Sequence, residues 1–157
     1  MTDLSIALAQ LNVLVGDIDG NADKVIETAL KARDQLGADV VVFSELTLTG
    51  YPPEDLLLRA SLDLRIEQAL TRIKNEVSGI HLILGYPARR DGQLLNLAGH
   101  IHNGQIVMEY AKQCLPNYQV FDEKRYFTAG NQPGITRING IKVALTVCED
   151  IWQEEPM

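Results

Sequence analysis

The sequence predicts an α/β fold in which helices cover a mixed sheet, and three observations predict it. A short apolar, mostly β-branched run at 39–43 lacks polar alternation, which is typical of a strand covered on both faces. Two segments, 25–36 and 62–77, carry apolar residues at helical spacing, and each comes after a strand-like run along the chain. The second half changes to short strand-like segments separated by Asx-Gly dipeptides, which favour tight hairpins.

The first βα unit begins with a mostly apolar segment at 4–10, which we expect to be a buried strand leading into a Gly/Asp loop. Asn21 is the expected N-cap of the first helix, and Gly37 its stop. One apolar stripe runs along this helix, formed by Val25, Ile26, Ala29, Leu30, Ala32 and Leu36. The strand at 39–43 then completes a βαβ unit.

A second helix is expected after an irregular loop over 44–55, whose last residues have the chemistry of a helix first turn. It runs from about Ser61 until Gly79 ends it. Its buried stripe consists of Leu62, Ile66, Ala69, Leu70, Ile73 and Val77.

After Gly79 the spacing of apolar residues changes from the helical period to one typical of strands. Strands are expected at 81–86, 94–102, 105–110, 134–138 and 141–147. The dipeptides Asp91-Gly92, Asn103-Gly104 and Asn139-Gly140 suit two-residue turns, whose central residues need positive φ. A core-type strand over 143–147 and a helix start at 149–152 lie at the very end, so we expect a domain that is cut short.

Composition narrows the class of protein. The 157 residues are enough for one domain with a sizeable core. A net charge of −7 argues against affinity for nucleic acid or anionic lipid. Two cysteines without a CxxC pair predict no zinc site and a reducing, cytoplasmic compartment. We expect neither a signal peptide nor a membrane span, because the N-terminus is acidic and no apolar run approaches roughly 20 residues.

Three residues lie where strands leave the predicted sheet, the edge at which open α/β folds place ligands. Glu45 follows the buried strand, Cys148 follows the strand at 141–147, and Lys112 follows the strand ending near Tyr110. A thiol nucleophile, a carboxylate base and a cation beside the developing oxyanion are what amide hydrolysis through a thioester requires. Cys148 also directly precedes a helix start, whose backbone N–H groups stabilise a thiolate or an oxyanion.

Ordinary structural roles compete with this interpretation. A free cysteine such as Cys148 is more often a small core residue, and Glu45 and Lys112 taken singly are more often solvated loop charges. Cys114 lacks a strand-to-helix junction and is expected to be structural.

Three segments, in order along the chain, favour the catalytic interpretation over the ordinary structural roles. They are Phe43 to Leu57, which contains Gly-Tyr-Pro-Pro-Glu-Asp-Leu-Leu; the lysine segment through Leu-Pro-Asn-Tyr to Phe127; and Val-Cys-Glu-Asp-Ile-Trp from Val147. Together they resemble the nitrilase (carbon–nitrogen hydrolase) superfamily. The Pro-Pro and Leu-Pro-Asn-Tyr forms are similar to the N-terminal glutaminase domain of glutamine-dependent NAD synthetases.

The resemblance implies a four-layer α-β-β-α sandwich, of which this chain is the N-terminal portion. It implies a catalytic triad of Glu45 as general base, Lys112 at the oxyanion and Cys148 as nucleophile. It further implies substrate-binding roles for four residues: Glu123, which orients the lysine or the amide; Glu149, whose N–H completes the oxyanion hole; and Tyr51 and Tyr118 near the glutamine pocket.

The implied function is glutamine amide hydrolysis that supplies ammonia for ATP-dependent NAD synthesis from deamido-NAD. Residues 1–157 are then a partial carbon–nitrogen hydrolase domain, and the synthetase domain is absent. No cofactor is expected for the glutaminase step, whereas ATP and Mg belong to the absent domain; the intact protein is expected to be a homo-oligomer. The alternatives are a stand-alone amidase of the same superfamily and a non-catalytic truncated fragment.

Two further features carry little functional weight. His100 and His102 lie two apart in a strand and so share a face, but without a third ligand at suitable spacing we interpret them as sheet-surface histidines rather than a metal site. Gly16 and Gly20 fit neither a phosphate loop nor a dinucleotide-binding fingerprint.

Overall fold

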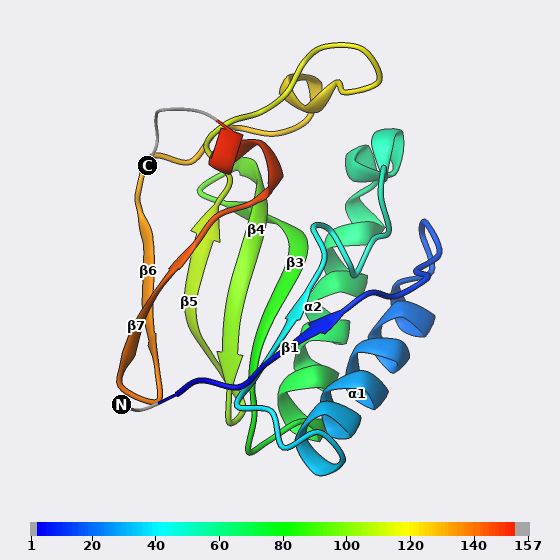
Figure 1. Ribbon diagram of the computed structural model, residues 1–157. Coiled ribbons are helices and arrows are strands. Elements are labelled where there is room, and N and C mark those ends of the chain that lie inside the picture. Colours follow the sequence, from blue (N-terminus) through cyan, green and yellow to red (C-terminus); the bar gives the residue numbers. More distant parts are fainter. Residues whose placement is uncertain (1–2, 153–157) are drawn as a thin grey trace.

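The computed structural model describes residues 3–152 and has an α/β architecture built on a five-stranded sheet (Figure 1). The sheet has the order β1-β2-β3-β4-β5, and a second sheet consists of β6 and β7. The strands are β1 Ile6–Ala9, β2 Val40–Phe43, β3 His81–Arg90, β4 Gln93–His102, β5 Gln105–Ala111, β6 Gly134–Ile138 and β7 Ile141–Leu145. The helices are α1 Ile18–Asp34 and α2 Ala60–Glu76, with 3₁₀ turns at Glu54–Leu58, Glu123–Arg125 and Cys148–Trp152.

The large sheet is mixed, as the sequence predicts. β1, β2 and β3 are parallel, with Ile6 opposite Val40 and Val40 opposite His81. β3, β4 and β5 are antiparallel neighbours joined by tight turns. All three predicted Asx-Gly turns are confirmed, because both residues of each dipeptide have positive φ, from 45° to 51° at the Asx and from 79° to 83° at the glycine.

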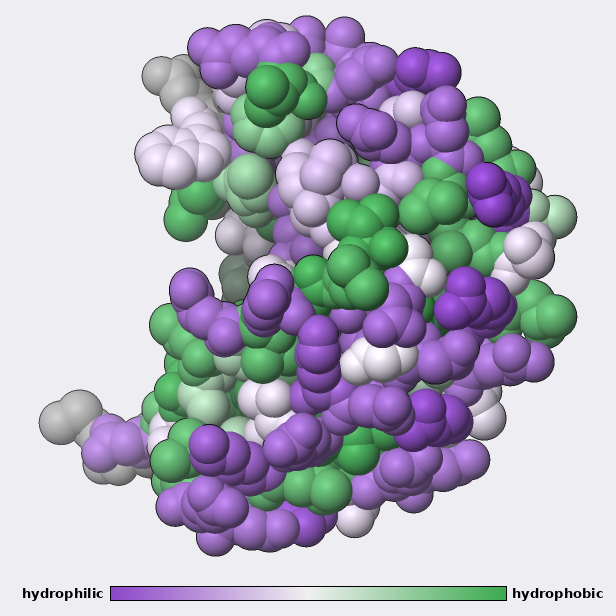
Figure 2. Space-filling view, turned by 90° about the vertical axis from the view of Figure 1, so that its right-hand side faces the viewer, coloured by the Kyte–Doolittle hydropathy of each residue, from purple (hydrophilic) through white to green (hydrophobic). Residues whose placement is uncertain are grey.

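Helices α1 and α2 form one layer on a single face of this sheet (Figure 1). Most residues of their predicted apolar stripes are buried, and Ala29 and Ile73 fully so. The prediction is wrong for Leu36, which lies beyond the end of α1 and is 64% exposed, and Leu30 is only partly buried. The outward surface of this layer is mainly hydrophilic, with hydrophobic side chains interspersed (Figure 2). Within the described residues, no helix is long and apolar enough to cross a membrane.

The predicted cap of the first helix is wrong. The N-cap is Asp17, whose carboxylate accepts from the N–H of Gly20 at 3.1 Å. Asn21 lies within α1 and is fully buried, where its amide bonds the backbone of Leu14 and the carbonyl of Leu48. The buried Asn21 side chain therefore connects the loop at Leu14 to the loop at Leu48 through hydrogen bonds. Local capping preferences do not reveal such a tertiary role.

The prediction of a buried first strand is also wrong in part. In the described part of the chain, β1 lies at the edge of the sheet and has β2 as its one neighbour. Ala7 and Ala9 pack against the core beneath the helices, whereas Ile6 and Leu8 point the other way and are 54% and 75% exposed. Successive side chains of a strand alternate between faces, so one covered face buries only every second residue.

The β6–β7 hairpin covers part of the opposite face. Ile138, Leu145 and Val147 form a second core with Val40, Ile83, Ala98 and Tyr110 of the large sheet. The described chain therefore has a helix layer, a five-stranded sheet and a two-stranded sheet, in that order.

Candidate active site

Glu45, Lys112 and Glu123 form a buried charge cluster at one end of the large sheet. The Lys112 Nζ lies 2.7 Å from Glu45 Oε1 and 2.8 Å from Glu123 Oε1. The Lys112 side chain is fully buried, and those of Glu45 and Glu123 are 16% and 7% exposed. An ammonium taken out of water is stable only when paired, and here two carboxylates pair it.

The strand directions explain why these residues meet. β2 is parallel to β3, and two antiparallel pairings separate β3 from β5, so β2 and β5 run the same way. Glu45 follows the end of β2 and Lys112 the end of β5. β7 also runs toward this end, the upper end in Figure 1, and delivers Cys148 there.

The loop that carries Glu45 is seated tightly on β3. The N–H of Leu48 donates to the carbonyl of Gly85 at 3.3 Å. A Cβ on Gly85 would lie 2.4 Å from the carbonyl oxygen of Ser44 and 2.5 Å from the nitrogen of Leu46. Only glycine permits this approach of the two backbones, and the approach fixes where Glu45 leaves the sheet.

Asn96 on β4 is a further member of the cluster that sequence reasoning missed. It is 1% exposed, and its Nδ2 donates to Glu45 Oε1 at 2.7 Å. The signal available in the sequence is a lone amide between apolar neighbours of a strand, Leu95 and Leu97. Within residues 3–152, Asn96 Oδ1 and Glu123 Oε2 are buried and accept no hydrogen bond, so each oxygen can still accept one from a substrate or water.

The electrostatics of the cluster favour a charged lysine. Burial would lower the pKa of Lys112, but the charges and hydrogen bonds of Glu45 and Glu123 outweigh it and raise the pKa above its ordinary value. Burial raises the pKa of Glu123, and the nearby Glu45 carboxylate adds to this, although Lys112 opposes it. The lysine therefore stays an ammonium at neutral pH.

Cys148 faces the same site across a small cavity. A cavity of about 110 Å³ is lined by Glu45 and Cys148, together with residues of β2, β3, β4 and the end of β7. Cys148 opens the last 3₁₀ turn with φ of 45°, and the residue is exposed. Partial burial and the Glu45 carboxylate raise the pKa of its thiol, whereas Lys112 and the N–H of Glu149 lower it. The sulfur is thus a neutral thiol at pH 7 and needs a base before it can attack.

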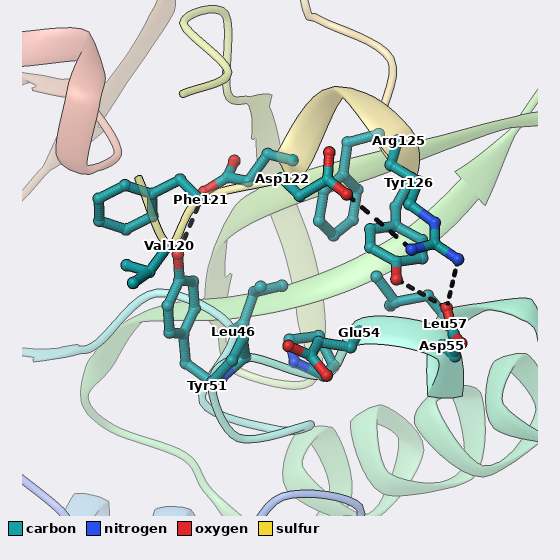
Figure 3. A pocket seen from close by; sticks show the side chains of 14 residues that line it. Leu46, Tyr51, Glu54, Asp55, Leu57, Val120, Phe121, Asp122, Arg125 and Tyr126 are labelled. Carbon is teal, nitrogen blue, oxygen red and sulfur yellow. Dashed lines mark hydrogen bonds and ion pairs between the residues drawn. The ribbon is translucent and has the colours of Figure 1, made fainter. Parts of the chain in front are cut away.

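The four residues with predicted substrate roles separate into two pairs. The Tyr51 hydroxyl donates to Glu123 Oε1 at a long 3.5 Å, and burial raises the pKa of this phenol. Tyr51 and Glu123 belong to the wall of a cavity of about 180 Å³, shown in Figure 3 between the Tyr51–Asp55 loop and residues 120–127. The Tyr118 hydroxyl donates to Glu149 Oε2 at 2.9 Å on the surface beside Cys148.

The interpretation of the histidines as surface residues is wrong for His100, which is 1% exposed. Its ring nitrogens lie 2.8 Å from His81 Nδ1 and 2.8 Å from the Thr136 hydroxyl on β6. The ring of His102 stacks on His81 at 3.7 Å, and an irregularity in the register falls directly after His100. Within residues 3–152 no group of three or more His, Cys, Asp or Glu residues is arranged to hold a metal.

Comparison with known proteins decides the family. The carbon–nitrogen hydrolase family model matches residues 5–157. The chain belongs to the carbon–nitrogen hydrolase family. Its similarity to glutamine-dependent NAD synthetases is also confirmed: it is 43% identical to the glutamine-dependent NAD(+) synthetase of Xanthomonas campestris pv. campestris (strain 8004), over 98% of this chain and 28% of that protein. It is 42% identical to the one from Thermotoga maritima, over 97% of this chain and 26% of that protein.

Solved structures of family members have the same fold. The glutamine-dependent NAD+ synthetase from Acinetobacter baumannii superposes with a TM-score of 0.91 and 42% identity, over 95% of this chain and 28% of that one. An amidase from Nesterenkonia sp. gives a TM-score of 0.83 and 27% identity, over 94% of this chain and 56% of that one. The chain therefore spans less than a third of the synthetases and a little over half of the amidase.

Proposed function

We propose that this chain is part of a glutaminase domain that releases ammonia from the side-chain amide of glutamine. The observation that carries the proposal is the convergence of Glu45, Lys112 and the Cys148 thiol at one end of the sheet. The similarity to glutamine-dependent NAD(+) synthetases supports glutamine as the amide.

The reaction follows from the protonation states of the three groups. Glu45 takes the proton of the Cys148 thiol as the sulfur attacks the amide carbon of glutamine. The C–N bond then breaks, Glu45 returns the proton to the leaving nitrogen, and ammonia departs from a γ-glutamyl thioester. Water, deprotonated by Glu45, attacks the thioester carbon; glutamate leaves, and the proton restores the thiol.

Lys112 is suited to the oxyanion that forms in both steps. An ammonium has three N–H donors, and among the described residues two of them are directed to Glu45 and Glu123. The third is available to the carbonyl oxygen of the substrate as its charge develops. The N–H of Glu149, which already acts on the Cys148 sulfur, is the proposed second donor.

We assign substrate contacts to Tyr51, Tyr118, Glu123 and Glu149. Glu123 belongs to the buried charge cluster and Tyr51 bonds to it, while Tyr118 and Glu149 border the nucleophile. Carboxylates beside the thiol suit the α-ammonium group of glutamine, since opposite charges attract strongly where water is partly excluded.

The rest of the proposed assignment concerns the whole protein. Residues 1–157 are part of a carbon–nitrogen hydrolase domain with a four-layer α-β-β-α sandwich, and a synthetase domain outside this chain uses the ammonia to convert deamido-NAD to NAD. The whole protein is proposed to be a cytoplasmic homo-oligomer that binds neither nucleic acid nor membranes.

The glutaminase step needs no cofactor, and ATP and Mg belong to the synthetase step. The residues of this chain do not fit a nucleotide phosphate at the start of α1, because the Asp17 carboxylate already caps the N–H of Gly20 there.

A second candidate is a stand-alone amidase acting on a small aliphatic amide. The similarity to the Nesterenkonia amidase favours it, and one structure of that amidase is described with butyramide bound. The greater identity to the synthetases favours glutamine instead.

Ammonia release by the purified chain tests the proposal. Glutamine and butyramide are supplied in parallel to the unmodified chain, to Cys148→Ala and to the matched control Cys114→Ala, and folding of each is verified by circular dichroism. We expect ammonia from glutamine with the unmodified chain and Cys114→Ala, and none above background with Cys148→Ala. Release from butyramide alone would favour the amidase, and background release by a folded unmodified chain would identify a non-catalytic fragment.

A further inference from the structure

Asp150 is a fully buried carboxylate outside the proposed catalytic set, and it accepts hydrogen bonds from one tyrosine hydroxyl and from three backbone N–H groups. Its Oδ2 accepts from the Tyr110 hydroxyl at 2.7 Å and from the N–H of Val147 at 2.9 Å. Its Oδ1 accepts from the N–H of Gln113 at 3.1 Å and from the N–H of Cys114 at 2.8 Å. Three backbone N–H groups and a phenol thus satisfy both oxygens of this buried carboxylate.

The four donors come from the two segments that carry the proposed catalytic residues. Gln113 and Cys114 directly follow Lys112, and Tyr110 precedes it on β5. Val147 directly precedes Cys148, and Asp150 belongs to the same 3₁₀ turn. One side chain therefore ties the lysine segment of the large sheet to the cysteine turn of the small sheet.

The cysteine turn needs such a tie because its backbone is strained. Cys148 has φ of 45°, a left-handed conformation that residues other than glycine adopt only when the surroundings impose it. The Asp150 N–H closes the turn on the carbonyl of Val147 at 3.1 Å, while the Asp150 carboxylate accepts from the Val147 N–H. The N–H and the carboxylate of Asp150 thus both bond the backbone of Val147, the residue directly before Cys148.

We propose that Asp150 is the positioning residue of the nucleophile: it fixes the Cys148 turn against the segment that follows Lys112 and so sets the approach of the thiol to Glu45 and Lys112. The catalytic meaning of this role rests on the proposed glutaminase function, whereas the geometric role does not. An asparagine at this position keeps the shape but turns an N–H₂ group toward donors, so at least one of the four hydrogen bonds is lost.

The test measures the ionisation of the Cys148 thiol through its rate of alkylation by iodoacetamide against pH, followed by mass spectrometry in a Cys114→Ser background. The variants are Asp150→Asn, Tyr110→Phe, which removes one donor and keeps the carboxylate, and Tyr86→Phe as the matched control. Tyr86 is also fully buried and donates at 2.7 Å, but to Glu109.

We expect Asp150→Asn to raise the pH midpoint of alkylation by roughly 0.5–1 unit, because the N–H of Glu149 no longer holds its place at the sulfur. Tyr110→Phe is expected to shift it less and in the same direction, and Tyr86→Phe not at all, although both tyrosine variants lose a buried hydrogen bond. An unchanged or lowered midpoint in the folded variants overturns the proposal, as does an equal shift in Tyr86→Phe. If Asp150→Asn does not fold, the midpoint of Tyr110→Phe takes its place: a rise relative to Tyr86→Phe supports the proposal, and no rise overturns it.

Glutamine turnover separates this proposal from the function on which it rests. If the chain hydrolyses glutamine, Asp150→Asn is expected to lower kcat more than tenfold with little change in KM, because the thiol and not the substrate is displaced. A raised KM with unchanged kcat would overturn the positioning role. If the unmodified chain hydrolyses nothing, the glutaminase proposal fails, and the alkylation midpoints still decide the role of Asp150.

Discussion

Replacing Lys112 by methionine tests whether the buried charge cluster has the energetics that its geometry indicates. The substitution keeps a long unbranched side chain, so packing changes little. It removes the ammonium that lies 2.7 and 2.8 Å from Glu45 and Glu123, whose side chains are 16% and 7% exposed. Two carboxylates then remain close together without the cation that compensates them.

The expected loss of unfolding free energy is large. Removing one partner of a buried ion pair costs about 3–5 kcal/mol, and two carboxylates lose their partner here, which favours the upper half of that range. For a chain of this size each kcal/mol shifts Tm by about 2–4 °C, so Tm should fall by roughly 8–20 °C at pH 7.

The pH dependence gives a sharper criterion. Burial and the Glu45 carboxylate raise the pKa of Glu123, and Lys112 opposes this rise. Without Lys112 the folded-state pKa of Glu123 rises further above its unfolded value, so the folded state binds more protons. The destabilisation is then greatest above that folded pKa and is relieved as pH falls through it. Adding Glu123→Gln to Lys112→Met removes one of the two charges and should recover part of the stability at pH 7.

Thermal unfolding followed by circular dichroism at pH 5 and pH 7 measures these effects. The control is Lys142→Met on the exposed surface of β7, where we expect a change within about 0.5 kcal/mol. A loss below about 1 kcal/mol for Lys112→Met at pH 7, or a loss that grows at pH 5, would refute the reasoning.

Two further predictions concern the support of the site and the packing of the two sheets. Gly85→Ala should displace the Glu45 loop, because its Cβ would lie 2.4 Å from the Ser44 carbonyl oxygen. We expect a loss of about 3 kcal/mol or more in denaturant unfolding and of most glutamine turnover, and full activity would contradict the tight seating of this loop. Burial, together with the neighbouring His81 and His102, lowers the pKa of His100 to about 4 from its ordinary 6.5. Since the unfolded state binds more protons in this window, the resulting stability is present above pH 6.5 and lost as pH falls toward 4, by up to about 3 kcal/mol. His100→Gln should lack this component of the pH–stability profile, and parallel profiles for the two proteins would contradict it.

Much of the fold could be predicted because local signals decide it. The Asx-Gly turns fold as expected, since their positive φ values suit only a few residue types. Most residues of the apolar stripes of α1 and α2 are buried as expected, because the helical period itself places them on one face; Leu36, beyond the end of α1, is exposed. The positions of Glu45, Lys112 and Cys148 after strand ends predict that they lie at one end of the sheet, as they do, whereas their catalytic roles stay a prediction.

The tertiary structure alone decided which polar groups meet across the sheet. Asn21 fits a cap by its type, yet it fastens loops around Leu14 and Leu48. Asn96 and Asp150 carry no local signal of their partners on other segments, Glu45 and Val147 among them. The physical reason is the sequence separation of the interacting groups. Turn and helix preferences are properties of a few consecutive residues, whereas a buried polar group finds its partner on a distant segment that only the folded chain brings within about 3 Å.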